Sequence, residues 1–314
     1  MEKVMDLSIM IVGSSNFDIN LMVKDIPVVG ETILASDMQT GFGGKGGNQA
    51  FTIVRIGGKV DFLTCLGDDV FGKLYFEEFR KNGFDLDYIK VINNKPNGTA
   101  IINIDKDGRN NIVVYPGSSR SLTPDLIKDN LEMVLSHDII MTQLEIPVET
   151  TEYITSIKTR NNIFILNPSP VDKNHDYSGI LKEVDILMPN EVELSQLAGI
   201  NIVDMDDVKK ASEKMLSKGV KNMVVTLGKK GVFVKNAQIQ EYIEAPDVKV
   251  IDTAGAGDAF AGSFMFKYAK TKDIIAAAKF ANKVATISVT RQGTYKSVPT
   301  KQEIEQMADF FNES

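Results

Sequence analysis

Short apolar runs alternate with longer amphipathic stretches along this chain of 314 residues. The apolar runs are rich in valine and isoleucine and predict buried β-strands at Ser8–Val12, Val60–Leu66, Ile139–Thr142, Ile163–Asn167, Ile186–Met188 and Asn222–Leu227. Between them, apolar residues at three- and four-residue spacing predict helices at Val70–Asn82, Pro124–Leu135, Val148–Thr159, Met205–Lys218 and Ile274–Thr290. This alternation indicates βαβ units, so we expect an α/β fold with a mainly parallel sheet covered by helices on both faces.

Two segments, residues 17–42 and 98–115, interrupt this alternation. In the second segment, Thr99–Asp105 and Asn111–Tyr115 flank the turn Lys106–Gly108, which is typical of a β-hairpin. No linker rich in proline, glycine or serine divides the chain. We therefore expect one domain over residues 1–314, with a small β lid built from the two insertions.

Composition excludes several classes of protein. A net charge of −7 and a pI of about 5.1 argue against non-specific binding to nucleic acid. No apolar stretch is long enough to span a bilayer, and Met1–Gly13 lacks the features of a signal peptide, so we expect no membrane partner. A single cysteine, Cys65, excludes an intrachain disulfide and predicts a cytoplasmic protein in which Cys65 is a core residue. His137 and His175 match no motif and are expected to be structural.

The segment Ile251–Phe260 leads from a strand-like stretch at Val248–Ile251 through small residues into an apolar helix. The backbone N–H groups of Gly255, Ala256 and Gly257 can converge on an anion there, and the helix dipole favours negative charge at the same point. Asp258 follows, where a carboxylate can accept a proton from an attacking hydroxyl. Taken alone, the segment is also explained as a tight turn followed by an ordinary helix-start carboxylate.

Two further segments combine glycines with polar side chains. In Gly43–Ala50, the glycines allow a ligand to approach the backbone closely, and Lys45 and Asn48 supply donors suited to sugar hydroxyls. The glycine spacing is not that of a P-loop. In Gly13–Asp18, Asn16 and Asp18 follow the first predicted strand. The alternatives from the residues alone are a flexible loop for the former and a solvated strand-end turn for the latter.

These segments together resemble the ribokinase-like (phosphofructokinase-B type) carbohydrate kinases. Asp252–Gly262 is similar to the family's C-terminal signature, and Gly43–Ala50, with Gly57 and Gly67, to its N-terminal signature. Ser263, where the family usually has alanine or glycine, is one departure. The resemblance extends from Gly13 to Ser297 and implies a three-layer, Rossmann-like fold with a β-sheet lid. It also implies an ATP-dependent kinase of a sugar's primary hydroxyl, with the 5-hydroxyl of D-ribose as the expected acceptor.

The resemblance assigns roles to individual residues. The catalytic carboxylate is Asp258, and Gly255, Ala256 and Gly257 form the anion site beside it. The residues that hold the sugar are Asn16, Asp18, Gly44, Lys45, Asn48, Glu145 and Asp258. The residues that bind ATP are Asn190, Thr226, Gly228, Gly231, Gly257 and Asn282. For Asn190 and Glu193, the alternative from the residues alone is a capped helix start with solvated acids.

Metal ions and assembly are also implied by the resemblance. Glu193 is expected to position Mg²⁺, through bound water. A K⁺ ion is expected to activate the enzyme at a site built from Asp252, Ala254, Ser288, Arg291, Gly293 and Ser297. A homodimer through the lid is expected by analogy.

Three alternatives remain at this level. Kinases for deoxyribose, fructose or a nucleoside share the same signatures. A dinucleotide-binding dehydrogenase would share the α/β alternation, but Gly13–Asn16 lacks the required glycine spacing. A non-catalytic sugar-binding protein on a kinase scaffold would be expected to have lost Asp258 or the small-residue turn before it.

Overall fold

The computed structural model describes residues 6–312, and its main sheet has nine strands in the order β13-β12-β11-β10-β9-β8-β1-β4-β5. Every pairing from β11 across to β5 is parallel, whereas β12 pairs antiparallel with both β11 and β13. The expected mainly parallel sheet is therefore confirmed. Its strands are β1 (Ile9–Val12), β4 (Asp61–Gly67), β5 (Ile89–Ile92), β8 (Ile139–Thr142), β9 (Ile163–Leu166), β10 (Ile186–Leu187), β11 (Asn222–Thr226), β12 (Gly231–Lys235) and β13 (Gln240–Glu244).

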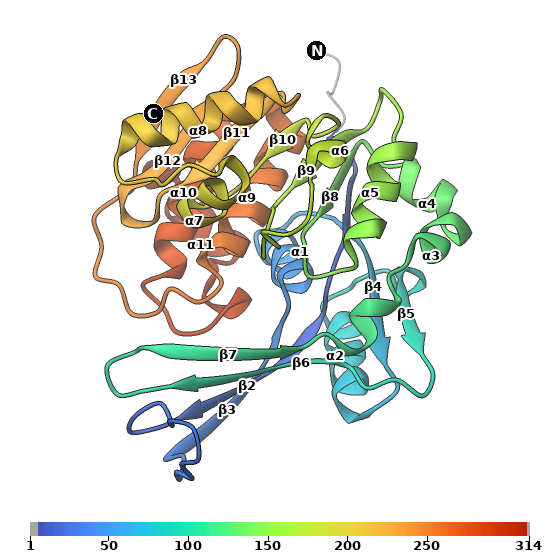
Figure 1. Ribbon diagram of the computed structural model, residues 1–314, viewed down its shortest axis with the longest axis vertical. Coiled ribbons are helices and arrows are strands. Elements are labelled where there is room, and N and C mark those ends of the chain that lie inside the picture. The colour runs from blue at the N-terminus through green and yellow to red at the C-terminus, as the bar shows by residue number, and fades with distance from the viewer. Residues whose placement is uncertain (1–5, 313–314) are drawn as a thin grey trace.

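Helices cover both faces of this sheet (Figure 1). Strand β1 shows why: Ile9 and Ile11 belong to one hydrophobic core, and Met10 and Val12 to the other. Because successive side chains of a strand point to opposite faces, a strand buried on both sides is apolar throughout. The first core includes α1 (Lys45–Arg55), α2 (Val70–Lys81), α9 (Ala256–Thr271) and α10 (Ile274–Ser288). The second includes α3 (Pro124–Asp129), α4 (Leu131–Leu135), α5 (Val148–Ile157), α6 (Ser178–Leu181), α7 (Glu191–Ala198) and α8 (Met205–Ser217).

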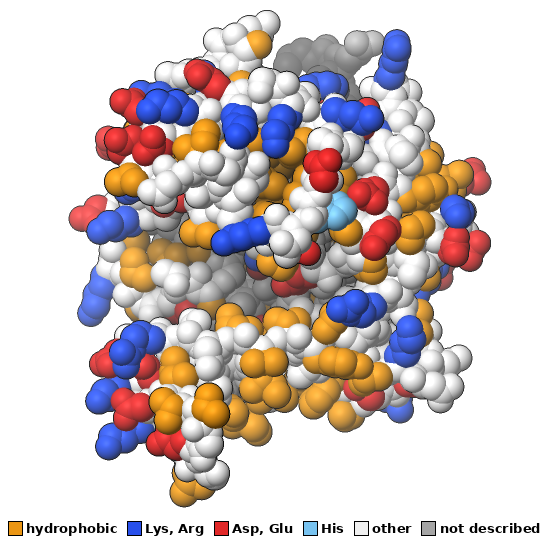
Figure 2. Space-filling view, in the orientation of Figure 1, with side chains coloured by type: hydrophobic (Ala, Val, Ile, Leu, Met, Phe, Trp, Pro, Cys, Tyr) orange, Lys and Arg blue, Asp and Glu red, His pale blue; other side chains and the backbone are white. Residues whose placement is uncertain are grey.

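A separate four-stranded sheet extends from this body, at the bottom of Figure 1. Its order is β3 (Asp37–Gly43), β2 (Asn16–Met22), β6 (Gly98–Ile104) and β7 (Asn110–Tyr115), so the two insertions pair with each other as expected. Figure 2 shows a hollow between this sheet and the body, with apolar side chains over the sheet. On strand β7, Ile112, Val113 and Val114 are exposed. Pairing of two subunits through this sheet stays a prediction.

Three local expectations were wrong or incomplete. The helix expected over Pro124–Leu135 is interrupted at Asn130, because the Asn130 side-chain amide donates to the Leu126 carbonyl (2.8 Å), which a continuous helix would use for a backbone hydrogen bond. Val248–Ile251 forms no strand, because the Ile251 N–H donates instead to the Val289 carbonyl (2.7 Å) at the end of α10. The edge strands β5 and β13, and β12 next to β13, were not predicted.

The remaining short elements connect these layers. They are the 3₁₀ turns η1 (Leu86–Tyr88), η2 (Gly117–Ser121), η3 (Gly228–Lys230) and η4 (Tyr295–Ser297) and the helices α11 (Lys301–Gln306) and α12 (Ala308–Asn312). Cys65 is fully buried in β4, as expected. Among residues 6–312, no helix has the length and apolar character that crossing a membrane requires.

Candidate active site

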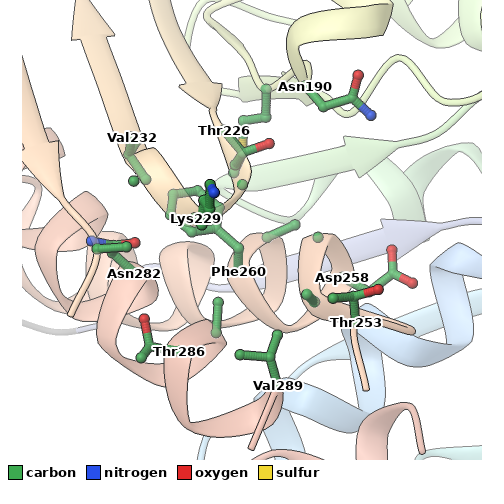
Figure 3. Close-up of a pocket in the computed structure, with 18 of the residues that line it drawn as sticks. Asn190, Thr226, Lys229, Val232, Thr253, Asp258, Phe260, Asn282, Thr286 and Val289 are labelled. Carbon is green, nitrogen blue, oxygen red and sulfur yellow. The ribbon is translucent and has the colours of Figure 1, made fainter. Parts of the chain in front are cut away.

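A cavity of about 470 Å³ opens beyond the carboxyl ends of β9, β10 and β11, between these strands and helices α9 and α10. This is the edge at which open α/β sheets bind ligands. The six residues expected to bind ATP all line it: Asn190, Thr226, Gly228, Gly231, Gly257 and Asn282. In Figure 3, Asn282 lies at one end of the cavity and Asp258 at the other. An elongated ligand can therefore have one end at Asn282 and the other at Asp258.

Apolar side chains make up much of the cavity wall, and sequence reasoning missed them. They include Val232, Phe260 and Val289, which Figure 3 shows around the same space as Asn282. Such a wall suits a flat aromatic ring, while Asn282 supplies a polar group at its edge. In the sequence, these residues cannot be told from core residues, because both are apolar positions at helix or strand spacing.

The first turn of α9 lies at the end of the cavity that holds Asp258. Gly255 precedes the helix with φ 72°, and no side chain among the described residues caps it. The Ala256 N–H donates to the Thr253 carbonyl (3.2 Å), whereas those of Gly255 and Gly257 form no backbone hydrogen bond with any described residue. The turn can thus offer N–H donors to an anion, although Ala256 is used within the turn itself. Negative charge is favoured there by the helix dipole.

Asp258 occupies this turn and is 7% exposed. Its Oδ2 accepts a hydrogen bond from Asn48 Nδ2 (3.0 Å), and its Oδ1 accepts one from Gln49 Nε2 (3.2 Å). Burial raises the pKa of Asp258 above its usual value, against the opposing effects of the Lys45 charge and these hydrogen bonds. A carboxylate with a raised pKa is a better proton acceptor.

Lys45 brings positive charge to a group of carboxylates. It begins α1 and lines the cavity, and it forms no ion pair within 4.0 Å with any described carboxylate. Burial alone would lower the pKa of Lys45, but the charges of Asp258, Glu145 and Glu193 outweigh burial and raise it. Glu145 itself is fixed from two sides, because its Oε2 accepts from the Lys45 backbone N–H (2.9 Å) and from the Ser14 hydroxyl. The ammonium group therefore stays charged, with its donors available to a ligand.

Asn16, Asp18 and Asn48 lie on the other side of Asp258, where the small sheet joins the body. Asn16 and Asn48 are 3% and 6% exposed, and the Oδ1 atom of each has no hydrogen-bond partner among the described residues. Burial, followed by the negative charges of Glu145 and Asp258, raises the pKa of Asp18 to about 7. Buried oxygens without donors are costly, so this cluster suits a ligand with several hydroxyl groups.

Glycines make room for this cluster. A Cβ at Gly43 would lie 2.0 Å from Asp18 Oδ2, and one at Gly98 would lie 2.2 Å from Asn16 Oδ1. Gly44 has φ 80°, and a Cβ there would lie 2.6 Å from the Asn16 backbone nitrogen. The backbone approaches these polar side chains so closely that no larger residue fits.

Asn190 and Glu193 form a capping box at the start of α7. The Asn190 side chain accepts from the Glu193 N–H (2.8 Å), and Glu193 Oε2 accepts from the Asn190 N–H (2.9 Å). Asn190 and Glu193 therefore cap the helix and also line the cavity. No group of three or more acidic, cysteine or histidine residues among those described is arranged to hold a metal ion. One carboxylate with one oxygen already engaged fits a contact to Mg²⁺ through water better than direct ligation.

The residues expected to bind K⁺ are brought together only in part. Asp252 accepts from the Ala254 N–H (2.9 Å) and from the Gly293 N–H (2.9 Å), and so ties the turn before α9 to the segment after α10. The Arg291 side chain turns away to Glu303 (2.8 Å). The hydroxyls of Ser288 and Ser297 donate to carbonyls three residues earlier. Arg291 could therefore offer a cation only its backbone oxygen, whereas the hydroxyl oxygens of Ser288 and Ser297 keep lone pairs that a cation could use.

Comparison with known proteins identifies the family. Residues 6–301 match the pfkB family of carbohydrate kinases. Ribokinase from Haemophilus influenzae is 34% identical over 294 residues, which is 93% of this chain and 95% of that protein. Deoxyribokinase from Salmonella typhi is 32% identical over 307 residues, or 98% of this chain and 99% of that protein.

Solved structures agree with these relatives. The crystal structure of ribokinase from Thermotoga maritima has a TM-score of 0.88 and 37% identity, and covers 96% of this chain and 99% of its own. The structure of Arabidopsis thaliana ribokinase complexed with ribose and ATP has a TM-score of 0.89 and 32% identity, and covers 99% of this chain and 100% of its own. This chain belongs to the pfkB family of carbohydrate kinases and is an ATP-dependent sugar kinase.

Proposed function

We propose that this kinase transfers the γ-phosphoryl group of ATP to the primary 5-hydroxyl of D-ribose, giving ribose 5-phosphate and ADP. The observation that carries the proposal is the enclosed polar cluster next to Asp258, in which Asn16 Oδ1 and Asn48 Oδ1 lack partners among the described residues. A furanose supplies hydroxyl donors to these oxygens and to Asp18. The Arabidopsis ribokinase complexed with ribose and ATP supports the same acceptor.

In the proposed mechanism, the sugar lies between the small sheet and Asp258, and ATP occupies the cavity with its adenine near Asn282. Asp258 accepts the proton of the attacking hydroxyl. Lys45 and the N–H groups at the start of α9 stabilise the charge on the transferred phosphoryl group. Closure of the small sheet over the sugar would exclude water and so limit ATP hydrolysis.

We also propose that Mg²⁺ and K⁺ assist this reaction. Bound with ATP, Mg²⁺ neutralises phosphate charge, and Glu193 would position it through water. A K⁺ ion near Asp252 would order the turn that carries Asp258 without entering the chemistry. The hydrogen bonds that Asp252 accepts from the Ala254 and Gly293 N–H groups support this role, because they already join the two segments that the ion would link.

The test is an ADP-release assay with Mg·ATP across ribose, 2-deoxyribose, fructose, inosine and adenosine, with the product mass recorded. Ribose is expected to have the highest kcat/KM, because an analogue without one hydroxyl leaves a buried polar group unpaired, which costs about 10- to 100-fold. Running the assay in K⁺ and in choline salts tests the cation, since equal rates would remove its proposed role.

The second candidate acceptor is 2-deoxyribose. This acceptor is favoured by the similarity to the Salmonella typhi deoxyribokinase, which extends over 98% of this chain. A higher kcat/KM for deoxyribose than for ribose would select this candidate. The phosphoryl-transfer mechanism would then stand, and only the assignment of Asn16 and Asp18 to a complete set of ribose hydroxyls would fall.

The pKa of Asp18 predicts a pH dependence of sugar capture. Because burial and neighbouring carboxylates raise it to about 7, the carboxyl group of the free enzyme is protonated below that pH and ionised above it. The ionised form is the better acceptor for sugar hydroxyls, so kcat/KM for the sugar should rise between about pH 6 and about pH 8. The Asp18→Asn variant should lose this part of the profile. An unchanged profile in that variant would show that another group titrates.

A further inference from the structure

Two buried side-chain amides, those of Gln143 and Gln49, form a chain that ends on the carboxylate of Asp258, and the half-buried amide of Asn167 joins this chain at Gln49. Gln143 Nε2 donates to Gln49 Oε1 (2.7 Å), and Gln49 Nε2 donates both to Asn167 Oδ1 (3.1 Å) and to Asp258 Oδ1 (3.2 Å). Gln49 and Gln143 are completely buried. They come from different elements, since Gln49 lies in α1, Gln143 follows β8 and Asn167 follows β9. The family signatures drew attention to Gln49 only as a neighbour of Asn48, and to the other two not at all.

The direction of every hydrogen bond in this chain is determined by one backbone group. Asn167 Nδ2 donates to the Met188 carbonyl (2.8 Å), which can only accept. Asn167 must therefore turn its oxygen toward Gln49, and Gln49 must turn its NH₂ group toward Asn167 and Asp258. The oxygen of Gln49 then faces Gln143, which has to donate. The orientation of the Gln49 amide is thus set by contacts rather than left free to flip.

The hydrogen-bonded amides leave one buried oxygen unpaired, and this has an energetic cost. Gln143 Oε1 is buried and has no hydrogen-bond partner among the described residues. It faces the backbone of Gly13, where a Cβ would lie 2.2 Å away. If the Gln143 amide were turned over, its nitrogen would face Gly13 without a hydrogen-bond acceptor. Its oxygen would then lie against Gln49 Oε1. Buried amides without partners are unfavourable, and apolar side chains of the same size would fill this space without that cost.

We propose that Gln49 is a positioning residue that fixes the carboxylate of Asp258 for proton transfer, and that Gln143 holds Gln49 in the donating orientation. With Asn48 on Oδ2 and Gln49 on Oδ1, both oxygens are held, and the plane of the carboxylate is set. Each donor also favours the ionised form against the effect of burial. The inference rests on the proposed role of Asp258 as proton acceptor.

The test is the pH profile of kcat in Gln49→Met, which keeps the length of the side chain and removes its amide. Loss of a donor to the charged carboxylate should shift the acidic limb of the profile to higher pH by about one unit and lower kcat about tenfold at neutral pH. The KM for ATP should change less than about twofold, because Gln49 does not line the ATP cavity.

Gln143→Met is the second variant, and it decides the question alone if Gln49→Met fails to fold. Gln143 does not contact Asp258. Its replacement should nevertheless shift the acidic limb of the kcat profile in the same direction by a smaller amount, because Gln49 loses the partner that orients its amide. The double variant should shift no further than Gln49→Met, since both changes act through one contact.

Asn162→Leu is the matched control. Asn162 is also a buried amide, and its Nδ2 donates to the carbonyls of Leu135 and His137, before β9 rather than after it. This variant should lower the melting temperature and leave the pH profile of kcat unchanged. Profiles of Gln49→Met and Gln143→Met that match the wild type would overturn the inference. If they match while Asp258→Asn is inactive, only this inference falls; if Asp258→Asn stays active, the proposed role of Asp258 falls as well.

Discussion

Asp258→Asn is expected to lower kcat by about 10²- to 10⁴-fold, because it removes the proposed proton acceptor from the start of α9. Binding of ATP should remain nearly intact, since most of the cavity wall lies between Asp258 and Asn282. The measurement is kcat from ADP release, together with calorimetric titration of ADP. A variant that keeps a tenth of the wild-type activity would contradict the assignment.

The surroundings of Asp258 indicate that this variant will fold. An asparagine has one acceptor oxygen where the carboxylate has two, so one of the two donors must find a new partner. Gln49 is held by Gln143 and Asn167, but Asn48 Oδ1 has no partner among the described residues. Asn48 can therefore turn its amide and accept from the new NH₂ group. Asp206→Asn, in the first turn of α8, is the matched control and should leave kcat unchanged.

Lys45→Met is expected to have the second largest effect, a loss of about 10²- to 10³-fold in kcat/KM for both substrates. Lys45 is the positive charge that offsets Asp258, Glu145 and Glu193, and its own pKa is raised by them. Without it, these carboxylates would repel the phosphates of ATP. The pKa of Asp258 would also rise further, which would shift the acidic limb of the kcat profile to higher pH.

Lys229→Met provides the control for this prediction. Lys229 lines the same cavity but is exposed to solvent, so the loss of its charge is screened and should change kcat/KM only a few-fold. Steady-state kinetics of both variants, with ADP and sugar titrations, would separate the two cases. Equal effects of the two substitutions would show that Lys45 contributes only to the net charge of the cavity.

The alternation of apolar runs and amphipathic stretches was enough to predict the main layers of the fold. The run over Ile139–Thr142 and the start of the helix at Val148 agree with the structure to the residue. The reason is that a strand buried on both faces must be apolar throughout, and a helix on a sheet must be apolar at three- and four-residue spacing. The edge strand β13 was missed because its exposed positions are polar and weaken that pattern.

The family signatures also gave the polar residues of the proposed site, because their glycines and polar side chains are consecutive in the sequence. Gly255–Asp258 and Gly43–Asn48 each act as one local unit, at the start of α9 and of α1. A site formed by a turn and the helix that follows it consists of adjacent residues, so its motif can be recognised in the sequence. The structure brings these two units together, with Asn48 and Asp258 in direct contact although 210 positions separate them.

Only the tertiary structure decided how these groups influence one another. The pKa of Asp18 near 7, the charge balance around Lys45 and the amide chain from Gln143 to Asp258 all depend on burial and on contacts between distant segments. A buried glutamine and an exposed one look the same in a sequence, as do an apolar core residue and one that lines a cavity. The sequence by itself determined the layers and indicated the proposed reactive residues, because local periodicity encodes the layers and the turn motifs contain those residues. The protonation and orientation of those residues were decided by packing, because desolvation and hydrogen bonding arise only when the segments meet.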